Sequence, residues 1–183
     1  MQWVDRLQEV TGWQEPRWEC DWKSVESDLG TALPGDYKEL CDRFGPGYFS
    51  DYIRVVPGLG RESVLYWRQV HKELFEESPV GEELTFSPYK AYGVDGKNGL
   101  LTWGTSETEG FFFWLADAAV DPDEWPILAR YDMSLDQEWD RYEMSVSEFV
   151  YRVIADPEFK FYGVARLVWP PTFSRFEGFT SDV

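Results

Sequence analysis

Few residues in this chain could carry out chemistry, and their spacing matches no common catalytic or metal site. The 183-residue sequence holds one histidine, His71, and two cysteines, Cys20 and Cys41. A single imidazole excludes sites that need two, such as HExxH zinc proteases and Cys₂His₂ zinc fingers. The cysteines form no CxxC pair. Their number allows one disulfide, but we expect two free thiols that behave as small buried hydrophobic side chains.

His71 is the candidate general base, because its ordinary pKa lies nearest to neutrality. It falls four residues after Trp67 and four before Phe75, at the apolar face of an expected helix. This position favours a packed, hydrogen-bonded histidine. A cryptic enzyme would need His71 exposed in a pocket beside a nucleophile, so we expect no catalytic residue.

Carboxylates are abundant, but their pattern does not single out a site. Residues 121–124 and 132–140 lack the spacing of an EF-hand loop, and Gly58-Leu59-Gly60 lacks the glycine and lysine of a nucleotide-binding loop. Two carboxylates with tryptophans for sugar stacking could hydrolyse glycosides. Here the acids are too numerous to select a pair, and the tryptophans fall at expected core positions. We expect no metal and no cofactor.

The net charge indicates the kind of partner. The chain has 34 acidic and 17 basic residues, a net charge of −17 and a pI near 4.3. Binding to nucleic acid or to an anionic membrane depends on Lys and Arg, so both partners are disfavoured and a basic protein is favoured. Hydrophobic residues make up 43% of the chain, which is enough for a packed core.

The acidity is concentrated in one part of the chain. Residues 105–143 hold 11 acidic residues against Arg130 and Arg141, a net charge of −9. This segment is either a solvated face or a docking surface for a basic protein. Trp125 and Trp139 could anchor such a partner, although both also suit the core. The candidate contact residues, all in loops between expected strands, are Glu107, Glu109, Asp121, Asp123, Glu124, Asp136 and Glu138.

Three short amphipathic helices are expected to open the chain. Apolar residues recur at helical spacing over 3–11, from Trp22 to Gly30, and from Leu33-Pro34 to Gly45. Asp21 is placed to cap the second helix, and a glycine follows each. The residues expected inward are Trp3, Val4, Leu7, Val10, Trp22, Val25, Leu29, Tyr37, Leu40, Cys41 and Phe44.

Strand-like patterns follow. Residues 48–56 indicate a strand, and residues 61–77 a helix with Val64, Trp67, Val70, His71, Leu74 and Phe75 inward. Further strands are expected at 84–86, 89–94, 100–103, 111–115, 125–131 and 139–144, with a hairpin turn at 95–99 and the central strand at 111–115.

A capping box, Ser145-x-x-Glu148, predicts a closing helix that buries Val146, Phe149, Val150, Val153 and Ile154. Residues 157–183 are aromatic but irregular and are expected to form an appendage. The order of elements predicts an α+β fold, with a mainly antiparallel sheet packed against helices in a single domain over residues 1–183.

Several short motifs, in this order, resemble the SMI1/KNR4 family of the SUKH superfamily over residues 18–156. They are Trp22 to Leu29-Gly30, Leu33-Pro34-x-x-Tyr37, Phe44-Gly45-Pro46-Gly47, Ala91-Tyr92-Gly93, Leu101-Thr102-Trp103, Trp125-Pro126 and Ser145-x-x-Glu148-Phe149. The motif residues Trp22, Leu29, Gly30, Leu33, Pro34, Tyr37, Phe44 and Gly45 are interpreted as capping and core residues.

The resemblance implies an α+β binding module without enzymatic activity. Many bacterial members look like immunity proteins that bind and neutralise a cognate toxin, and fungal relatives act as scaffolds. We therefore expect an immunity protein whose partner is a basic toxin domain, such as a nuclease; the alternative is a scaffold or regulatory adaptor without a toxin. The amino terminus lacks the basic and apolar segments of a signal peptide, which predicts a cytoplasmic protein.

Overall fold

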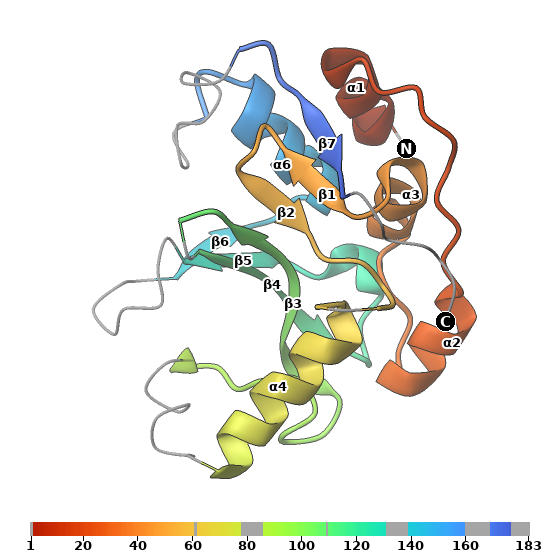
Figure 1. Cartoon of the computed structure of the whole chain (residues 1–183). Coiled ribbons are helices and arrows are strands. Elements are labelled where there is room, and N and C mark those ends of the chain that lie inside the picture. Colours follow the sequence, from red (N-terminus) through yellow and green to blue (C-terminus); the bar gives the residue numbers. More distant parts are fainter. Residues whose placement is uncertain are drawn as a thin grey trace.

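A seven-stranded antiparallel sheet forms the centre of the molecule. The computed structural model describes residues 2–60, 62–77, 86–108, 110–130, 139–159 and 169–176. The strands lie in the order β6-β5-β4-β3-β2-β1-β7 (Figure 1). Their bounds are β1 Gly47–Phe49, β2 Ile53–Val55, β3 Asn98–Ser106, β4 Phe111–Asp117, β5 Ile127–Arg130, β6 Asp140–Tyr142 and β7 Phe173–Arg175.

Five helices of the described residues pack on this sheet, which makes the fold α+β, as predicted. They are α1 Gln2–Thr11, α2 Trp22–Leu29, α3 Gly35–Phe44, α4 Val64–Glu77 and α6 Val146–Ala155. One face of the sheet carries α1, α3 and α6, and Figure 1 shows α4 well apart from these three. A short 3-10 helix, η1 (Pro122–Glu124), lies in the connection between β4 and β5. In the described residues, no helix is long and apolar enough to cross a membrane.

Aromatic side chains fill the main core between the sheet and these helices. Phe149 of α6 meets the rings of Trp103 and Phe112 at centroid distances of 5.7 and 5.4 Å. Tyr37 of α3 packs edge-on against Trp114 at 4.8 Å, and its hydroxyl donates a hydrogen bond to the Val56 carbonyl. Such ring pairs stabilise a core beyond the area that they bury. They fix the position of α3, whose first turn contributes to the site described below.

Local sequence signals set the helix ends as predicted. The Asp21 carboxylate accepts a hydrogen bond from Ser24 N at the start of α2, and Ser145 Oγ accepts one from Glu148 N at the start of α6. Gly30 ends α2 with a φ of 72°, in the left-handed region that favours glycine. The five apolar residues expected inward on α6 are all buried.

The opposite face of the sheet carries α4 and a second apolar cluster. This cluster consists of Phe86, Leu100, Phe113 and Leu128, with Leu115 and Tyr89 packed against it. Side chains alternate between the two faces along a strand, which explains why there are two apolar clusters. In β4, Trp114 points to the main core, and its neighbours Phe113 and Leu115 point to the other face.

Several predictions about the strands were wrong. Residues 48–56 form not one strand but β1 and β2, joined by a turn in which Ser50 and Asp51 have positive φ. Residues 89–94 contribute only an isolated bridge from Ala91 to Leu100, so no hairpin forms across 95–99. The strand at 100–103 is part of β3, which pairs with β2 and β4.

Three further expectations need correction, and a fourth lies mostly outside the described residues. Residues 173–175 form β7, which pairs with β1, so this stretch belongs to the sheet rather than to an appendage. On α4, Leu74 is 43% exposed rather than inward, and the helix begins at Val64. β4 is an interior strand, but β3 occupies the centre of the order. The strand expected at 84–86 includes Leu84 and Thr85, which the structure does not describe.

Candidate functional site

Three adjoining hollows surround η1, and together they form the candidate site. The largest, of about 680 Å³, lies between residues 88–99 and the connection from β4 to β5. A second of about 290 Å³ shares Glu124 and Trp125 with it, and a third of about 450 Å³ shares Asp123 and Ser145 with the second. The three hollows therefore adjoin one another around η1, and we call them the η1 surface.

Carboxylates dominate the lining of the η1 surface. Seven acidic side chains line the three hollows, against two basic ones: Asp36, Glu39, Asp95, Asp117, Asp123, Glu124 and Glu143, against Lys90 and Arg141. Both basic side chains are already paired, Lys90 with Asp95 and Arg141 with Glu143. The lining thus carries a net charge of −5, which favours a cationic partner.

Two carboxylates hold the η1 surface together. Asp123 Oδ1 accepts a hydrogen bond of 2.6 Å from Gly35 N at the start of α3. Asp36 Oδ2 accepts hydrogen bonds of 2.9 and 3.0 Å from Ser147 N and Oγ at the start of α6. These contacts connect η1, α3 and α6, so the surface is formed before any partner arrives.

Glu39 carries a charge that nearby arginines compensate. Arg17 binds it through two nitrogens at 2.9 and 2.8 Å, and Arg43 contacts it at 2.6 Å. The hydrogen bonds from Arg17 are the main reason that the pKa of Glu39 falls to about 2. In the described residues, the lining carboxylates without a basic partner are Asp117, Asp123 and Glu124, at or near η1, and Asp36 on α3.

The acidic residues selected from the sequence do not form a single cluster. Asp121, Asp123 and Glu124 lie together at η1, and Asp121 caps it by accepting a hydrogen bond from Asp123 N. Glu107 follows β3 at the opposite end of β4, about 20 Å away along a seven-residue strand. Glu109, Asp136 and Glu138 lie outside the described residues.

Several residues of this surface were not among the candidates that the sequence pointed to. Asp36 and Glu39 come from α3, Asp95 precedes β3, and Glu143 follows β6. Only the tertiary fold brings α3 to η1, and no local pattern marks its acids as different from any solvated helix face.

The two tryptophans considered as anchors are both packed into the protein. Trp125 is 4% exposed, and its Nε1 donates a hydrogen bond to the Asp117 carbonyl. Trp139 Nε1 donates to the Ser87 carbonyl, and the Arg130 guanidinium lies 4.5 Å from its ring centroid. A partner could therefore meet the edge of Trp125 in the large hollow but could not bury a free indole ring.

His71 and the two cysteines lie apart from the hollows. His71 is 6% exposed among the rings of Trp67, Phe86, Phe111 and Phe113, and burial lowers its pKa to about 4. Its Nδ1 lies 3.5 Å from Thr102 Oγ1. Cys20 and Cys41 are free thiols, and burial raises the pKa of both. Within the described ranges, no group of acidic, histidine and cysteine side chains could hold a metal ion.

The motif residues have structural roles. Leu29, Leu33, Tyr37 and Phe44 are buried in the main core. Trp22 packs at its margin and donates a hydrogen bond to Asp42. Pro34 precedes α3, and Gly30 and Gly45 end α2 and α3.

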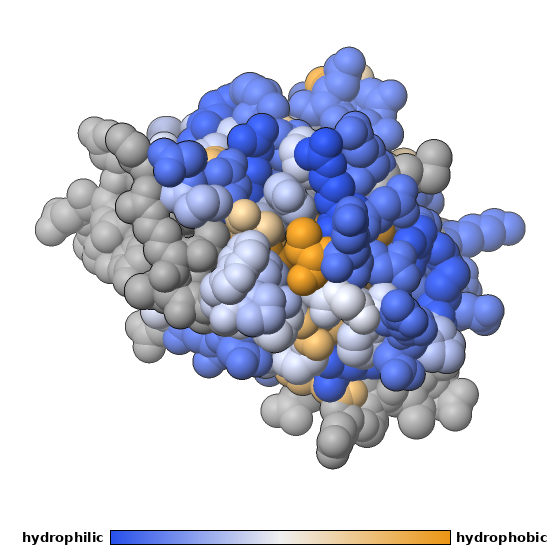
Figure 2. All heavy atoms as spheres, turned by 90° about the horizontal axis from the view of Figure 1, so that it is seen from above, coloured by the Kyte–Doolittle hydropathy of each residue, from blue (hydrophilic) through white to orange (hydrophobic). Residues whose placement is uncertain are grey.

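Seen from the side at the top of Figure 1, the surface is mostly hydrophilic, with small hydrophobic areas near its middle (Figure 2). No broad apolar interface is visible on that side.

Comparison with protein-family models, curated proteins and solved structures finds no significant match to this chain.

Proposed function

We propose that this chain is a non-enzymatic protein-binding module of the SMI1/KNR4 type, an immunity protein that neutralises a basic toxin domain by direct binding. The observation that carries the proposal is the η1 surface, a preformed set of hollows whose described lining has a net charge of −5. A basic domain, such as a nuclease that must hold nucleic acid, has the complementary charge.

The surroundings of the chemically competent residues support a binding role. His71 is enclosed by aromatic rings and lines none of the three hollows. The raised pKa of each thiol keeps Cys20 and Cys41 protonated, which lowers their reactivity as nucleophiles. The α+β fold agrees with the family that the sequence motifs resemble.

Growth rescue tests the proposal directly. The protein is co-expressed with a candidate toxin encoded next to it, and we expect growth to recover and a stable complex to form. If the toxin is active but growth does not recover and purified proteins show no binding, the immunity function is wrong. Complex formation with a partner that has no toxicity would support the adaptor function instead.

A charge reversal locates the docking surface. Glu124→Lys should slow association about threefold to tenfold at low salt and make binding less sensitive to salt, because a surface charge acts mainly on the encounter rate. Glu9→Lys is the matched control, since Glu9 is also exposed but lies on α1. Asp123 is unsuitable for this test because its carboxylate also holds α3. Equal effects of both variants would assign docking to the overall charge.

A further inference from the structure

We propose that the 680 Å³ hollow anchors an extended segment of the partner, which places an aliphatic side chain against Leu115 and a lysine or arginine beside Asp117. We call this hollow the β4 groove. This inference rests on the proposed function, because it names the chemistry by which a basic protein would bind the η1 surface. Its volume lies within the usual range for ligand sites, about 300–1,000 Å³.

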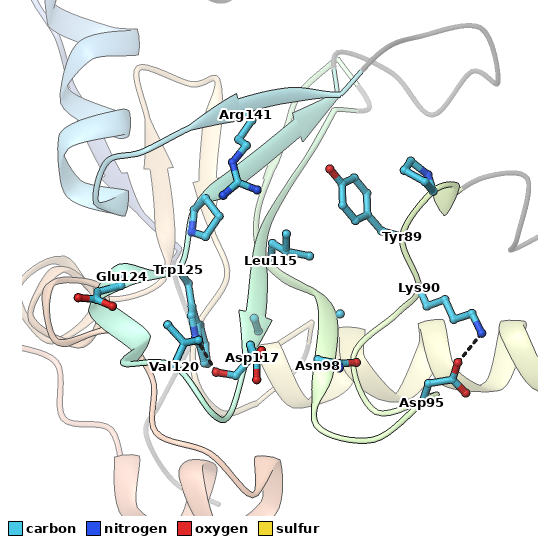
Figure 3. Close-up of a pocket in the computed structure, with 14 residues that line it drawn as sticks. Tyr89, Lys90, Asp95, Asn98, Leu115, Asp117, Val120, Glu124, Trp125 and Arg141 are labelled. Carbon is cyan, nitrogen blue, oxygen red and sulfur yellow. Dashed lines mark hydrogen bonds and ion pairs between the residues drawn. The ribbon is translucent and has the colours of Figure 1, made fainter.

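The floor of the β4 groove is apolar. Leu115 points to the face opposite the main core, where it packs against the cluster of Phe113, Leu128 and Leu100. Val120, which is 40% exposed, and Pro126 extend this apolar area toward η1. Figure 3 shows Leu115 between Tyr89 on one wall and Val120 and Asp117 on the other. An aliphatic side chain bound here would therefore extend the second cluster.

Backbone hydrogen bonds hold both walls of the groove. On one side, Leu100 N donates to the Lys90 carbonyl at 2.8 Å and Tyr92 N to the Leu100 carbonyl at 3.0 Å. Gly99 permits this close approach, since a Cβ atom there would lie 2.6 Å from the Lys90 oxygen. On the other side, Ala118 N donates to the Lys97 carbonyl at 2.9 Å. A preformed groove loses little conformational entropy when it binds.

The charges around the groove select a cation. Lys90 is paired with Asp95, and Arg141 Nε lies 2.7 Å from Glu143 Oε1. In the described part of the chain, Asp117 and Glu124 form no ion pair, and the hydrogen bond that Asp117 Oδ1 accepts comes from the Ala119 backbone. Figure 3 shows Asp117 beside Val120 on one wall of the groove and Glu124 at its edge. An anionic segment would have to compete with Glu143 for Arg141, whereas a cationic one meets unpaired carboxylates.

Selection from a library of displayed random 12-residue peptides tests this inference without a known partner. The purified full-length protein is the bait, and each enriched peptide is synthesised and its Kd measured. We expect enriched sequences that combine Lys or Arg with Leu, Ile or Val within a few residues. Failure to enrich any peptide, or enrichment of acidic peptides, would overturn the proposal.

Matched variants then locate the bound peptide. Leu115→Gln should weaken binding about tenfold or more, because it removes the apolar floor without adding charge. Leu74→Gln is the control, since Leu74 is exposed on α4 and lines none of the three hollows. If Leu115→Gln does not fold, Val120→Ser provides the same test at an exposed turn. Equal affinity for the variant and the control would place the peptide elsewhere and refute the proposal.

A separate pair of variants tests whether the groove prefers a lysine or an arginine. The double variant Asp117→Asn, Glu124→Gln should weaken peptide binding about fivefold at low salt and reduce its salt dependence, whereas Glu9→Gln should change neither. If the peptide bound the double variant and the wild type with the same affinity, the groove would not select a cation. Because no toxin is needed, the result is independent of growth rescue. Rescue without peptide binding would refute only the proposal for the groove. Peptide binding without rescue would refute only the proposed toxin neutralisation.

Discussion

Asp123 Oδ1 accepts a hydrogen bond of 2.6 Å from Gly35 N, although 88 residues separate the two in the sequence. The contact joins η1, in the connection between β4 and β5, to the first turn of α3. The backbone N–H groups of a helical first turn have no partner within the helix, so an external carboxylate satisfies one of them. An acidic side chain that the sequence marks as a surface charge is thus also a structural cap.

We predict that Asp123→Ala destabilises the protein by about 1 kcal/mol, the usual cost of losing a helix cap. Glu124→Ala, one residue further along the same turn, should stay within about 0.5 kcal/mol of the wild type, as exposed substitutions usually do. Asp123→Asn should recover most of the stability, because its side-chain oxygen can still accept the hydrogen bond. Urea unfolding measures all three, and equal losses for Ala and Asn would show that the charge matters rather than the acceptor.

Burial of His71 predicts a loss of stability in mild acid. Its pKa is lowered to about 4 in the folded protein, so the unfolded chain binds a proton first as the pH falls below about 6.5. Stability should be unaffected above this value, fall by about 2 kcal/mol by pH 5 and level off near pH 4. The measurement is urea unfolding at pH 7 and pH 5 for the wild type and His71→Phe. A pH dependence that is the same in both proteins would assign it to other groups.

The two thiols should be inert while the protein is folded. The pKa of Cys20 is raised to about 12 and that of Cys41 well above its ordinary value, in both cases mainly by burial. Because only the thiolate reacts, alkylation by iodoacetamide at pH 8 should be about 100-fold or more slower than in denaturant. Mass spectrometry after timed labelling measures both rates. Rapid modification of Cys20 in the folded protein would show that its burial is incomplete.

The helices could be predicted because their signals are local. Asp21, Gly30 and Ser145 mark helix ends through contacts within a few residues, and the apolar spacing selects the buried face. β1 and β2 were missed because their turn uses Ser50 and Asp51 in a left-handed conformation that glycine more often adopts. β7 has three residues and is defined by pairing with β1, which is more than 120 residues away.

The candidate site was only partly predictable for the same reason. The run Asp121-Pro122-Asp123-Glu124 is visible in the sequence as a local concentration of charge. Its grouping with Asp36 and Glu143 depends on where α3 and β6 lie in the fold. The sequence also cannot show that Arg17 compensates Glu39, since that contact is made across 22 residues of chain, whereas the Arg43 contact is a local i,i+4 pair within α3.

The ion pairs of Glu39 predict a second loss of stability, at a lower pH than the one predicted for His71. Hydrogen bonds from Arg17, and then from Arg43, lower the pKa of Glu39 from 4.5 to about 2. A carboxylate with a lowered pKa stabilises the folded state above its unfolded pKa, and this contribution is lost as the pH falls from about 4.5 to about 2. The full shift corresponds to about 3 kcal/mol, which we reduce to about 2 kcal/mol because Arg17 is half-exposed and solvent screens the pair.

Glu39→Gln should therefore be less stable than the wild type by about 2 kcal/mol at pH 6 and nearly equal to it near pH 2. The difference between the two unfolding free energies cancels the contribution of His71, and Glu9→Gln on α1 controls for the loss of one negative charge. A gap between wild type and Glu39→Gln that stayed constant from pH 6 to pH 2 would show that the arginines do not hold the carboxylate in its charged form.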